Sequence, residues 1–160
     1  MNSTHPICSM RKDDKSELLR VCQIWLNESI RCHNFVSDHP AQFWRSRQLD
    51  FLLDVIFADG YVWKENGLIK GFMTISGNYI RELFVDSLWH GKGIGTALMN
   101  RAKQYAKEKK YDYLETSVYE KNQSAIYFYI NKCGFEQKDP YAEPGTGLIK
   151  FKMEWQNHQL

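Results

Sequence analysis

The stretch at residues 79–99, YIRELFVDSLWHGKGIGTALM, decides the fold. Its first seven residues are rich in aromatic and branched apolar side chains, which favours a β-strand over 79–85. Further on, the apolar residues Ile94, Leu98, Ala102 and Tyr105 recur at helical spacing. The sequence therefore predicts a strand that runs through a short turn into an amphipathic helix.

Three glycines, Gly91, Gly93 and Gly95, alternate in the turn between this strand and this helix. Such a turn points several backbone N–H groups at one spot, where the helix dipole adds partial positive charge and attracts phosphate. Glycines also let the backbone approach a ligand that a Cβ atom would push away. The spacing matches neither the phosphate loop of ATPases nor the dinucleotide fingerprint, whose third glycine comes one residue later. Taken alone, the loop also fits a helix start that binds nothing.

Two motifs resemble the signatures of the GNAT superfamily of N-acetyltransferases. LFVD at 83–86 and HGKGIGTALM at 90–99 resemble that family's loop for the pyrophosphate of acyl-CoA, Gln/Arg-x-x-Gly-x-Gly/Ala. NxxAxxFYxxxxGF at 122–135 resembles its second signature, in which a helix supplies an Asn and a Tyr to the cofactor. The motifs follow in the expected order, separated by one helix and one strand. His90 departs from the pattern, because Gln or Arg is usual there.

The resemblance implies an acetyl-CoA-dependent N-acetyltransferase that acts by direct transfer in a ternary complex, without a metal. It also implies a cofactor site whose members belong to the two motifs. These residues are Leu83, Phe84, Val85, His90, Gly91, Lys92, Gly93, Ile94, Gly95, Thr96, Asn122, Ala125, Phe128 and Tyr129.

The reaction needs a base, because an alkyl ammonium with a pKa near 10.4 must lose its proton, which costs about 4–5 kcal/mol at pH 7. A carboxylate can remove that proton. Glu82, directly before the cofactor-binding segment, is the first candidate. Its alternative is a strand-edge carboxylate paired with Arg81 or with a lysine. Glu115, Glu120 and His33 are the other candidate bases.

The departing thiolate leaves better if an acid protonates it. The resemblance assigns this role to Tyr129, whose alternative is a plain core ring. It likewise assigns Asn122 to the pantetheine arm, although an Asn at the start of a helix also serves as an N-cap.

The segment at 32–40 interrupts helical periodicity and suits an irregular connection. Its His33 and Phe35 are candidates for the wall of the acceptor pocket, as this segment commonly is in the resembled family. Loop packing explains them equally well. Together with Trp25 and Ser29 they resemble small bacterial members of the family.

The remaining pattern predicts one α/β domain over 1–160, with a mixed, mostly antiparallel GNAT-like sheet of about seven strands and four helices. Asn66-Gly67 between two β-rich runs is a strong hairpin signal. Helix 41–57 is expected to bury Phe43, Trp44, Leu52, Val55 and Ile56. Strands are expected at 6–11, 61–64, 68–76, 79–85, 113–118, 135–139 and 148–155, and helices up to about 31 and at 41–57, 94–110 and 123–133.

Composition excludes several classes of protein. The net charge of +2 offers no strong electrostatic footprint for nucleic acid. No apolar run is long enough to cross a membrane, and the polar start does not resemble a signal peptide. The four cysteines show no metal-binding or disulfide spacing, which favours reduced thiols in a cytoplasmic protein. The protein is expected to be a monomer or a homodimer.

Two other classes of protein share part of this pattern. A nucleotide- or NAD-dependent enzyme requires a longer glycine motif and an early βαβ unit. A non-catalytic acyl-CoA sensor or interaction module keeps the loop but lacks acid and base. The acceptor amine stays open between a protein lysine, a protein N-terminus, a polyamine and an aminoglycoside.

Overall fold

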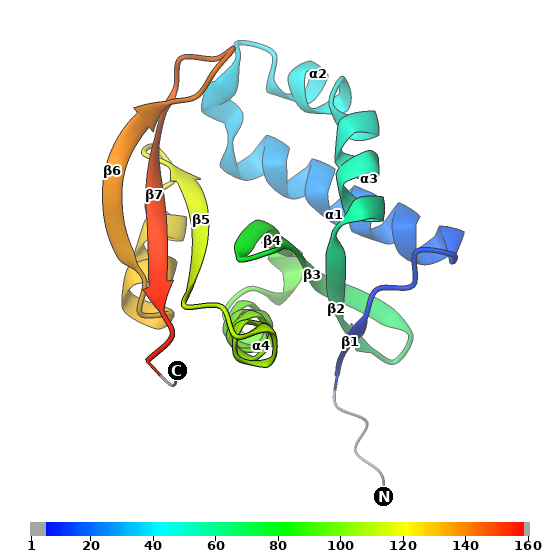
Figure 1. Ribbon diagram of the computed structural model, residues 1–160. Helices are drawn as coiled ribbons and strands as arrows, with labels where there is room; N and C mark the ends of the chain where they lie inside the picture. Colours follow the sequence, from blue (N-terminus) through cyan, green and yellow to red (C-terminus); the bar gives the residue numbers. More distant parts are fainter. Residues whose placement is uncertain (1–5, 159–160) are drawn as a thin grey trace, which may run out of the picture.

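The computed structural model describes residues 6–158, which form one mixed sheet with helices on both faces (Figure 1). The sheet has seven strands in the order β1-β2-β3-β4-β5-β7-β6. This arrangement confirms the predicted fold class and the predicted number of strands.

The first half of the sheet is an antiparallel meander. It consists of β1 (Ile7–Ser9), β2 (Asp59–Glu65), β3 (Leu68–Ser76) and β4 (Tyr79–Val85). The predicted Asn66-Gly67 turn joins β2 to β3, with positive φ angles of 50° and 77°. A two-residue turn of this kind matches the twist of the flanking strands and so fixes the register of the hairpin.

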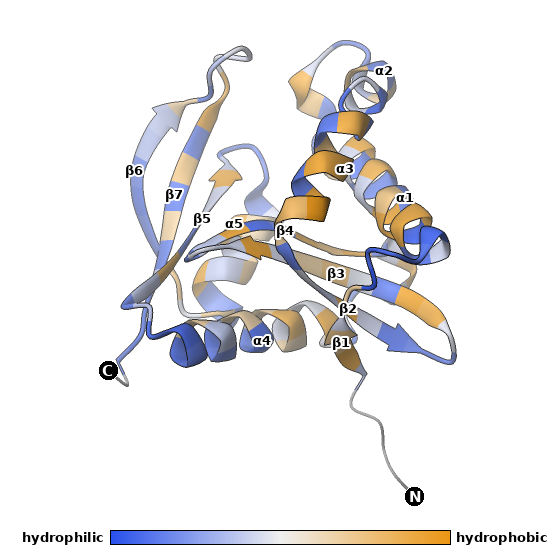
Figure 2. Cartoon of the chain, turned by 45° about the vertical axis from the view of Figure 1, so that its right-hand side comes forward, coloured by the Kyte–Doolittle hydropathy of each residue, from blue (hydrophilic) through white to orange (hydrophobic). Residues whose placement is uncertain are grey.

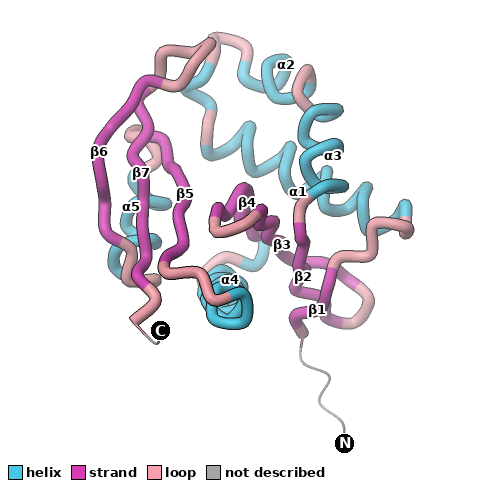
Figure 3. Tube along the Cα trace, viewed as in Figure 1, coloured by secondary structure: helices cyan, strands magenta, loops and turns pink. Residues whose placement is uncertain are grey.

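The second half contains β5 (Tyr113–Tyr119), β6 (Glu136–Ala142) and β7 (Ile149–Gln156), which pair antiparallel. The two halves meet in parallel at one residue pair only, Tyr79 with Glu115. The Thr116 hydroxyl adds a hydrogen bond of 2.9 Å to the Ile80 carbonyl. Beyond that point β4 and β5 are no longer paired, and Figure 3 shows the two groups of strands standing apart.

Helices cover both faces of the sheet and create two cores. On one face lie α1 (Lys15–Cys32), α2 (Pro40–Arg45) and α3 (Gln48–Phe57), which bury residues such as Trp25, Phe51 and Phe72. On the other face lie α4 (Ile94–Lys109) and α5 (Gln123–Tyr127), packed on residues such as Leu98 and Met153. The apolar sides of the helices turn towards the strands (Figure 2).

The single helix predicted for 41–57 is wrong, because the chain breaks at Ser46-Arg47 into α2 and α3. The Arg47 N–H bonds the Trp44 carbonyl, three residues back, which tightens the turn and ends α2. Residues 6–158 therefore contain five α-helices, one more than the four predicted. The break also shifts the buried face: Phe51 stacks on Trp25 at 4.4 Å, whereas Ile56 is 46% exposed.

The last predicted helix, 123–133, changes its winding part-way. It is α-helical as far as Tyr127 and continues as a π-helical turn over Phe128–Lys132. Such turns are rare and occur frequently at functional sites.

Candidate active site

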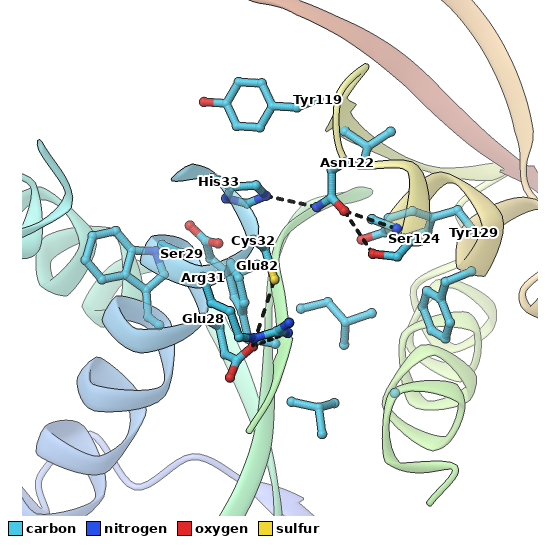
Figure 4. A pocket seen from close by; sticks show the side chains of 18 of the residues that line it. Glu28, Ser29, Arg31, Cys32, His33, Glu82, Tyr119, Asn122, Ser124 and Tyr129 are labelled. Carbon is cyan, nitrogen blue, oxygen red and sulfur yellow. Dashed lines mark hydrogen bonds and ion pairs between the residues drawn. The ribbon is translucent and has the colours of Figure 1, made fainter. Parts of the chain in front are cut away.

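A cavity of about 930 Å³ opens where β4 and β5 separate. One wall comes from α1 and the end of β4, and the opposite wall comes from the end of β5 and from α5. In Figure 4, Glu28, Ser29, Cys32 and His33 of α1 and its C-cap face Asn122, Ser124 and Tyr129. Because both halves of the sheet contribute, the site exists only in the folded domain.

The glycine loop forms the floor at one end of the cavity. Gly93 is the N-cap of α4 with φ 81°, a left-handed conformation that side chains with a Cβ disfavour, and no side chain caps the helix. The N–H groups of the first turn of this 16-residue helix have no intrahelical partner. Gly93, Ile94, Gly95 and Thr96 all line the cavity, so these donors fit an anionic ligand such as a pyrophosphate.

Gly95 has a different reason to be glycine. A Cβ atom there would lie 3.3 Å from the Phe128 ring, tighter than an ordinary contact. Gly95 therefore lets α5 and its π-helical turn pack closely on α4, beside the loop.

His33 and Asn122 join the two walls by a hydrogen bond of 3.0 Å. The Asn122 side-chain oxygen accepts from the Ala125 N–H and the Ser124 hydroxyl, so its amide nitrogen must face His33 and donate to Nε2. The neutral ring then carries its proton on Nδ1. Burial, followed by the charge of Lys150, lowers the pKa of His33 to about 4, which keeps the ring neutral at pH 7.

Two polar atoms on this side of the cavity have no hydrogen-bond partner within residues 6–158. They are the Ser29 hydroxyl oxygen and His33 Nδ1, one helical turn apart. Buried polar groups are almost always paired, and unpaired ones mark places where a ligand or water completes the site.

Glu82 stands on β4 in the same cavity, next to the indole of Trp25, which hydrogen-bonds its carboxylate. Arg81 has no partner on β3, because Thr74 pairs with Glu82 while Ile75 pairs with Ile80. Glu82 and Phe84 are two residues apart in β4 and therefore point to the same face, whereas the bulge turns Ile80 to the opposite face. Burial raises the pKa of Glu82 to about 8, against the opposing charges of Lys150 and Arg81.

Tyr129 lies in the π-helical turn and is 8% exposed. Burial raises the pKa of its hydroxyl above the usual range, against a hydrogen bond with Thr116. Because the Thr116 hydroxyl already donates to the Ile80 carbonyl, Tyr129 is the donor to Thr116. The hydroxyl thus keeps its proton at neutral pH and, with no ligand beside it, directs that proton at the Thr116 oxygen.

Comparison with known proteins decides the family. The family model described as "Acetyltransferase (GNAT) family" matches residues 17–135. The chain belongs to the GNAT family of acetyltransferases. This assignment confirms the predicted N-acetyltransferase class and its cosubstrate, acetyl-CoA.

Three relatives of this GNAT chain illustrate the match. Peptidyl-lysine N-acetyltransferase YiaC of Escherichia coli (strain K12) is 32% identical over 149 residues, covering 91% of this chain and 95% of YiaC. Peptidyl-lysine N-acetyltransferase YjaB of the same organism is 29% identical over 133 residues, covering 81% of this chain and 83% of YjaB. The apo-form structure of YjaB gives a TM-score of 0.75 at 25% identity, covering 93% and 95%. The structure of yncA from Salmonella typhimurium with acetyl-CoA gives 0.69 at 17% identity, covering 99% and 98%, which supports the fold alone.

The cavity gathers most of the residues predicted for the GNAT site, but two stand apart. Lys92 is exposed and Phe35 packs on the rings of His33 and Tyr119, and neither is among the described residues that line the cavity. Phe35 therefore follows the loop-packing interpretation, whereas His33 does line the wall. Glu115 and Glu120 are also outside the described lining. His33 is a poor base, because its Nε2 lone pair faces the Asn122 amide.

His90 is also placed differently from a residue that covers phosphates. Its Nε2 lies 2.7 Å from the Val85 carbonyl and 3.8 Å from Glu28, so the ring turns back towards β4 and α1. Glu28 is 4% exposed and accepts the Ser87 N–H and two bonds from Arg31.

Sequence reasoning missed the far end of the cavity. Tyr119 donates to both oxygens of Glu143 at 2.9 and 3.0 Å, Thr146 donates to the same carboxylate at 2.8 Å, and Lys150 lies 3.2 Å from it. These residues come from the end of β5, from β7 and from the turn between β6 and β7. No motif spans them, and only the pairing of β5 with β7 brings them together.

Proposed function

We propose that this chain transfers the acetyl group of acetyl-CoA directly to the ε-amine of a lysine in a protein or peptide. The observation that carries the proposal is that one cavity joins an anion-binding glycine loop to an aromatic chamber containing a buried carboxylate. The relatives named peptidyl-lysine N-acetyltransferases support a lysine as acceptor.

The glycine loop and Asn122 would hold the cosubstrate. The N–H groups at the start of α4 would bind the pyrophosphate, and Asn122 would contact the pantetheine arm while still capping α5. The thioester would then lie between β4 and Tyr129.

The chamber beside Glu82 suits an alkyl ammonium. The rings of Trp25, Trp44 and Phe84 line it, and such faces pack the methylene stem of a lysine and attract its charge. Glu82 provides the carboxylate that would accept the proton.

The raised pKa of Glu82 improves it as a base. Moving a proton from an ammonium of pKa about 10.4 to a carboxylate of pKa about 8 is less uphill by about 5 kcal/mol than to an ordinary glutamate. Keeping Glu82 ionised at pH 7 costs only about 1–2 kcal/mol in return. The easier proton transfer therefore outweighs the cost of ionising Glu82, and the raised pKa favours catalysis.

The transfer itself would need few groups. The neutral amine attacks the thioester carbonyl, the carbon–sulfur bond breaks, and Tyr129 supplies a proton to the departing sulfur. The proton that the nitrogen loses as the amide forms would pass through water to Tyr129 and restore its hydroxyl. Burial keeps the Tyr129 hydroxyl protonated until a stronger base than Thr116 appears beside it.

A panel of acceptors tests the proposal. Acetyl-CoA turnover is measured with an N-terminally blocked lysine peptide, the same peptide with a free N-terminus and no lysine, a polyamine and an aminoglycoside. We expect the lysine peptide to be the best acceptor and Glu82→Gln to lower its rate by roughly 10²-fold or more. A preference for any other acceptor, or no turnover with any, would overturn the lysine assignment.

A further inference from the structure

The far end of the cavity contains an amine of the protein itself. Lys150 projects from β7, opposite Tyr119 in the register of the sheet, and its side chain is 19% exposed. Its Nζ lies 3.2 Å from the Glu143 carboxylate and 4.6 Å from the centre of the Tyr119 ring. The proposed mechanism assigns this lysine no role.

Lys150 is on the acceptor side of the cavity. Two lysines are among the described lining residues, Lys132 and Lys150. Lys132 is exposed and belongs to the π-helical turn of the cofactor wall. The charge of Lys150, in contrast, lowers the pKa of both Glu82 and His33, so its ammonium acts directly on the chamber where we place the acceptor.

Little holds this ammonium in its resting position. Its partners are one hydrogen bond to Glu143 and a cation–π contact with Tyr119. Glu143 keeps three other hydrogen bonds, two from Tyr119 and one from Thr146, if the lysine swings away. Departure therefore leaves no buried carboxylate without partners, and the four-carbon stem of lysine is flexible enough to turn into the chamber.

We propose that Lys150 is an intramolecular acceptor, acetylated at Nζ by the active site of its own chain. The inference rests on the proposed function and adds a modification site to it. Glu82 takes a proton from the ammonium, Nζ attacks the thioester carbonyl and the new N–C bond forms. The C–S bond breaks and the CoA thiolate receives a proton from Tyr129. The nitrogen loses its second proton as the amide forms, and this proton passes through water to the Tyr129 phenolate, while Glu82 releases its proton to solvent. Acetyl-CoA is therefore the only other reactant.

Modification would change the site in two ways. The acetamide carries no charge, so Glu82 and His33 lose the nearby cation that favours the ionised form of Glu82. The added acetyl group also occupies the chamber that an external lysine would enter. Lys150 acetylation would thus slow further turnover, which makes it self-limiting.

The test follows Lys150 by mass spectrometry after incubation of the full chain with acetyl-CoA alone. Lys152 is the matched control, because it lies on the same face of β7 but is exposed and is not among the described lining residues. We expect Lys150 to be acetylated faster than Lys152, and Glu82→Gln to slow Lys150 by roughly 10²-fold or more without affecting Lys152. A lysine peptide in excess should protect Lys150. Equal modification of Lys150 in the parent and in Glu82→Gln would show ordinary chemical acetylation and overturn the proposal.

A mixing experiment checks that the transfer stays within one chain. Lys150→Arg keeps the charge but cannot be acetylated in this way, and Glu82→Gln keeps the lysine but lacks the base. Mixed with acetyl-CoA, the pair should leave Lys150 of the Glu82→Gln chain unmodified, and labelling there would contradict an intramolecular step. If the parent chain acetylates the lysine peptide but not Lys150, this inference alone is wrong. If it acetylates neither the peptide nor Lys150, the proposed function is wrong as well.

Discussion

At the residue scale, Tyr129 separates the chemical step from binding. The change Tyr129→Phe keeps the ring that packs against Phe128 and Phe135 but removes the proton donor. We expect the maximal rate to fall by roughly 10²- to 10⁴-fold, the usual span for a general acid, while acetyl-CoA affinity hardly changes. Steady-state kinetics and calorimetry measure the two quantities.

Thr116→Val provides a control for that variant, because it removes the hydroxyl partner of Tyr129 and keeps the acid. Its rate should fall much less. If Tyr129→Phe acetylates a confirmed acceptor at the parent rate, with chemistry rate-limiting, another group protonates the sulfur.

His90 makes a second prediction at this scale. Its ring ties the glycine loop to the end of β4 through the hydrogen bond of 2.7 Å between Nε2 and the Val85 carbonyl. His90→Leu removes this bond and should weaken acetyl-CoA binding by roughly 2- to 10-fold, the equivalent of about 0.5–1.5 kcal/mol. His90→Gln keeps a side-chain donor and should bind acetyl-CoA like the parent. Isothermal titration calorimetry measures the three affinities, and equal values in the parent and in His90→Leu would show that this bond does not support binding.

The sequence predicts a residue of the site where that residue belongs to a continuous motif. Glu82, the glycine loop and Tyr129 lie within two short runs, and the fold brings those runs to one cavity. Glu143 and Lys150 were missed because they come from a turn and a strand with no motif, and only the β5–β7 register joins them to the site. Phe35 was predicted to line the acceptor pocket because of its position in the loop. Its ring instead packs against His33 and Tyr119, and Phe35 is not among the described residues that line the cavity.

At the element scale, we expect the N-terminus of α4 and the glycine loop before it to bind acetyl-CoA. Gly93→Val forces a β-branched residue into a left-handed conformation, φ 81°, and should distort the loop enough to abolish acetyl-CoA binding while the domain stays folded. Gly77→Val is the matched control: φ is also positive, at 59°, space is open, and the turn lies outside the described lining of the cavity. Calorimetry should show lost binding in the first variant and parent-like binding in the second. Unchanged affinity in a folded Gly93→Val chain would show that the glycine loop does not bind acetyl-CoA.

Helices and strands were predictable where turn residues in the sequence mark their ends. Asn66-Gly67 closes the predicted hairpin, and the strand at 79–85 was predicted with the bounds it has. The break at Ser46-Arg47 lies in a short polar run, Arg45–Gln48, which contains neither Gly nor Pro, so no local breaker marks a helix end there. The π-helical turn at Phe128–Lys132 packs on α4 beside Gly95, and no local signal in the sequence marks it.

At the scale of the whole molecule, the two halves of the sheet share little backbone pairing, and the proposed ligand would lie between them. Acetyl-CoA at 100 times its dissociation constant should therefore stabilise the native state by about 2.7 kcal/mol. For a domain of this size that corresponds to a rise of about 5–10 °C in Tm. Thermal denaturation with and without acetyl-CoA measures the shift. Gly93→Val should show none, and an equal shift in that variant would place the ligand elsewhere.

The central claim is that the Glu82 carboxylate takes the proton of a lysine acceptor in this cavity. The most direct measurement is the pH dependence of kcat/KM for a lysine peptide in the parent and in Glu82→Gln. Because burial raises the pKa of Glu82 to about 8, its active ionised form is scarce below that pH. The parent rate should rise with pH, reach half of its plateau at about pH 8 and level off above it. Without the carboxylate only the free amine reacts, so Glu82→Gln should be slower and keep rising towards the pKa of the amine, about 10.4. Matching rates and matching profiles in the two proteins would contradict the claim.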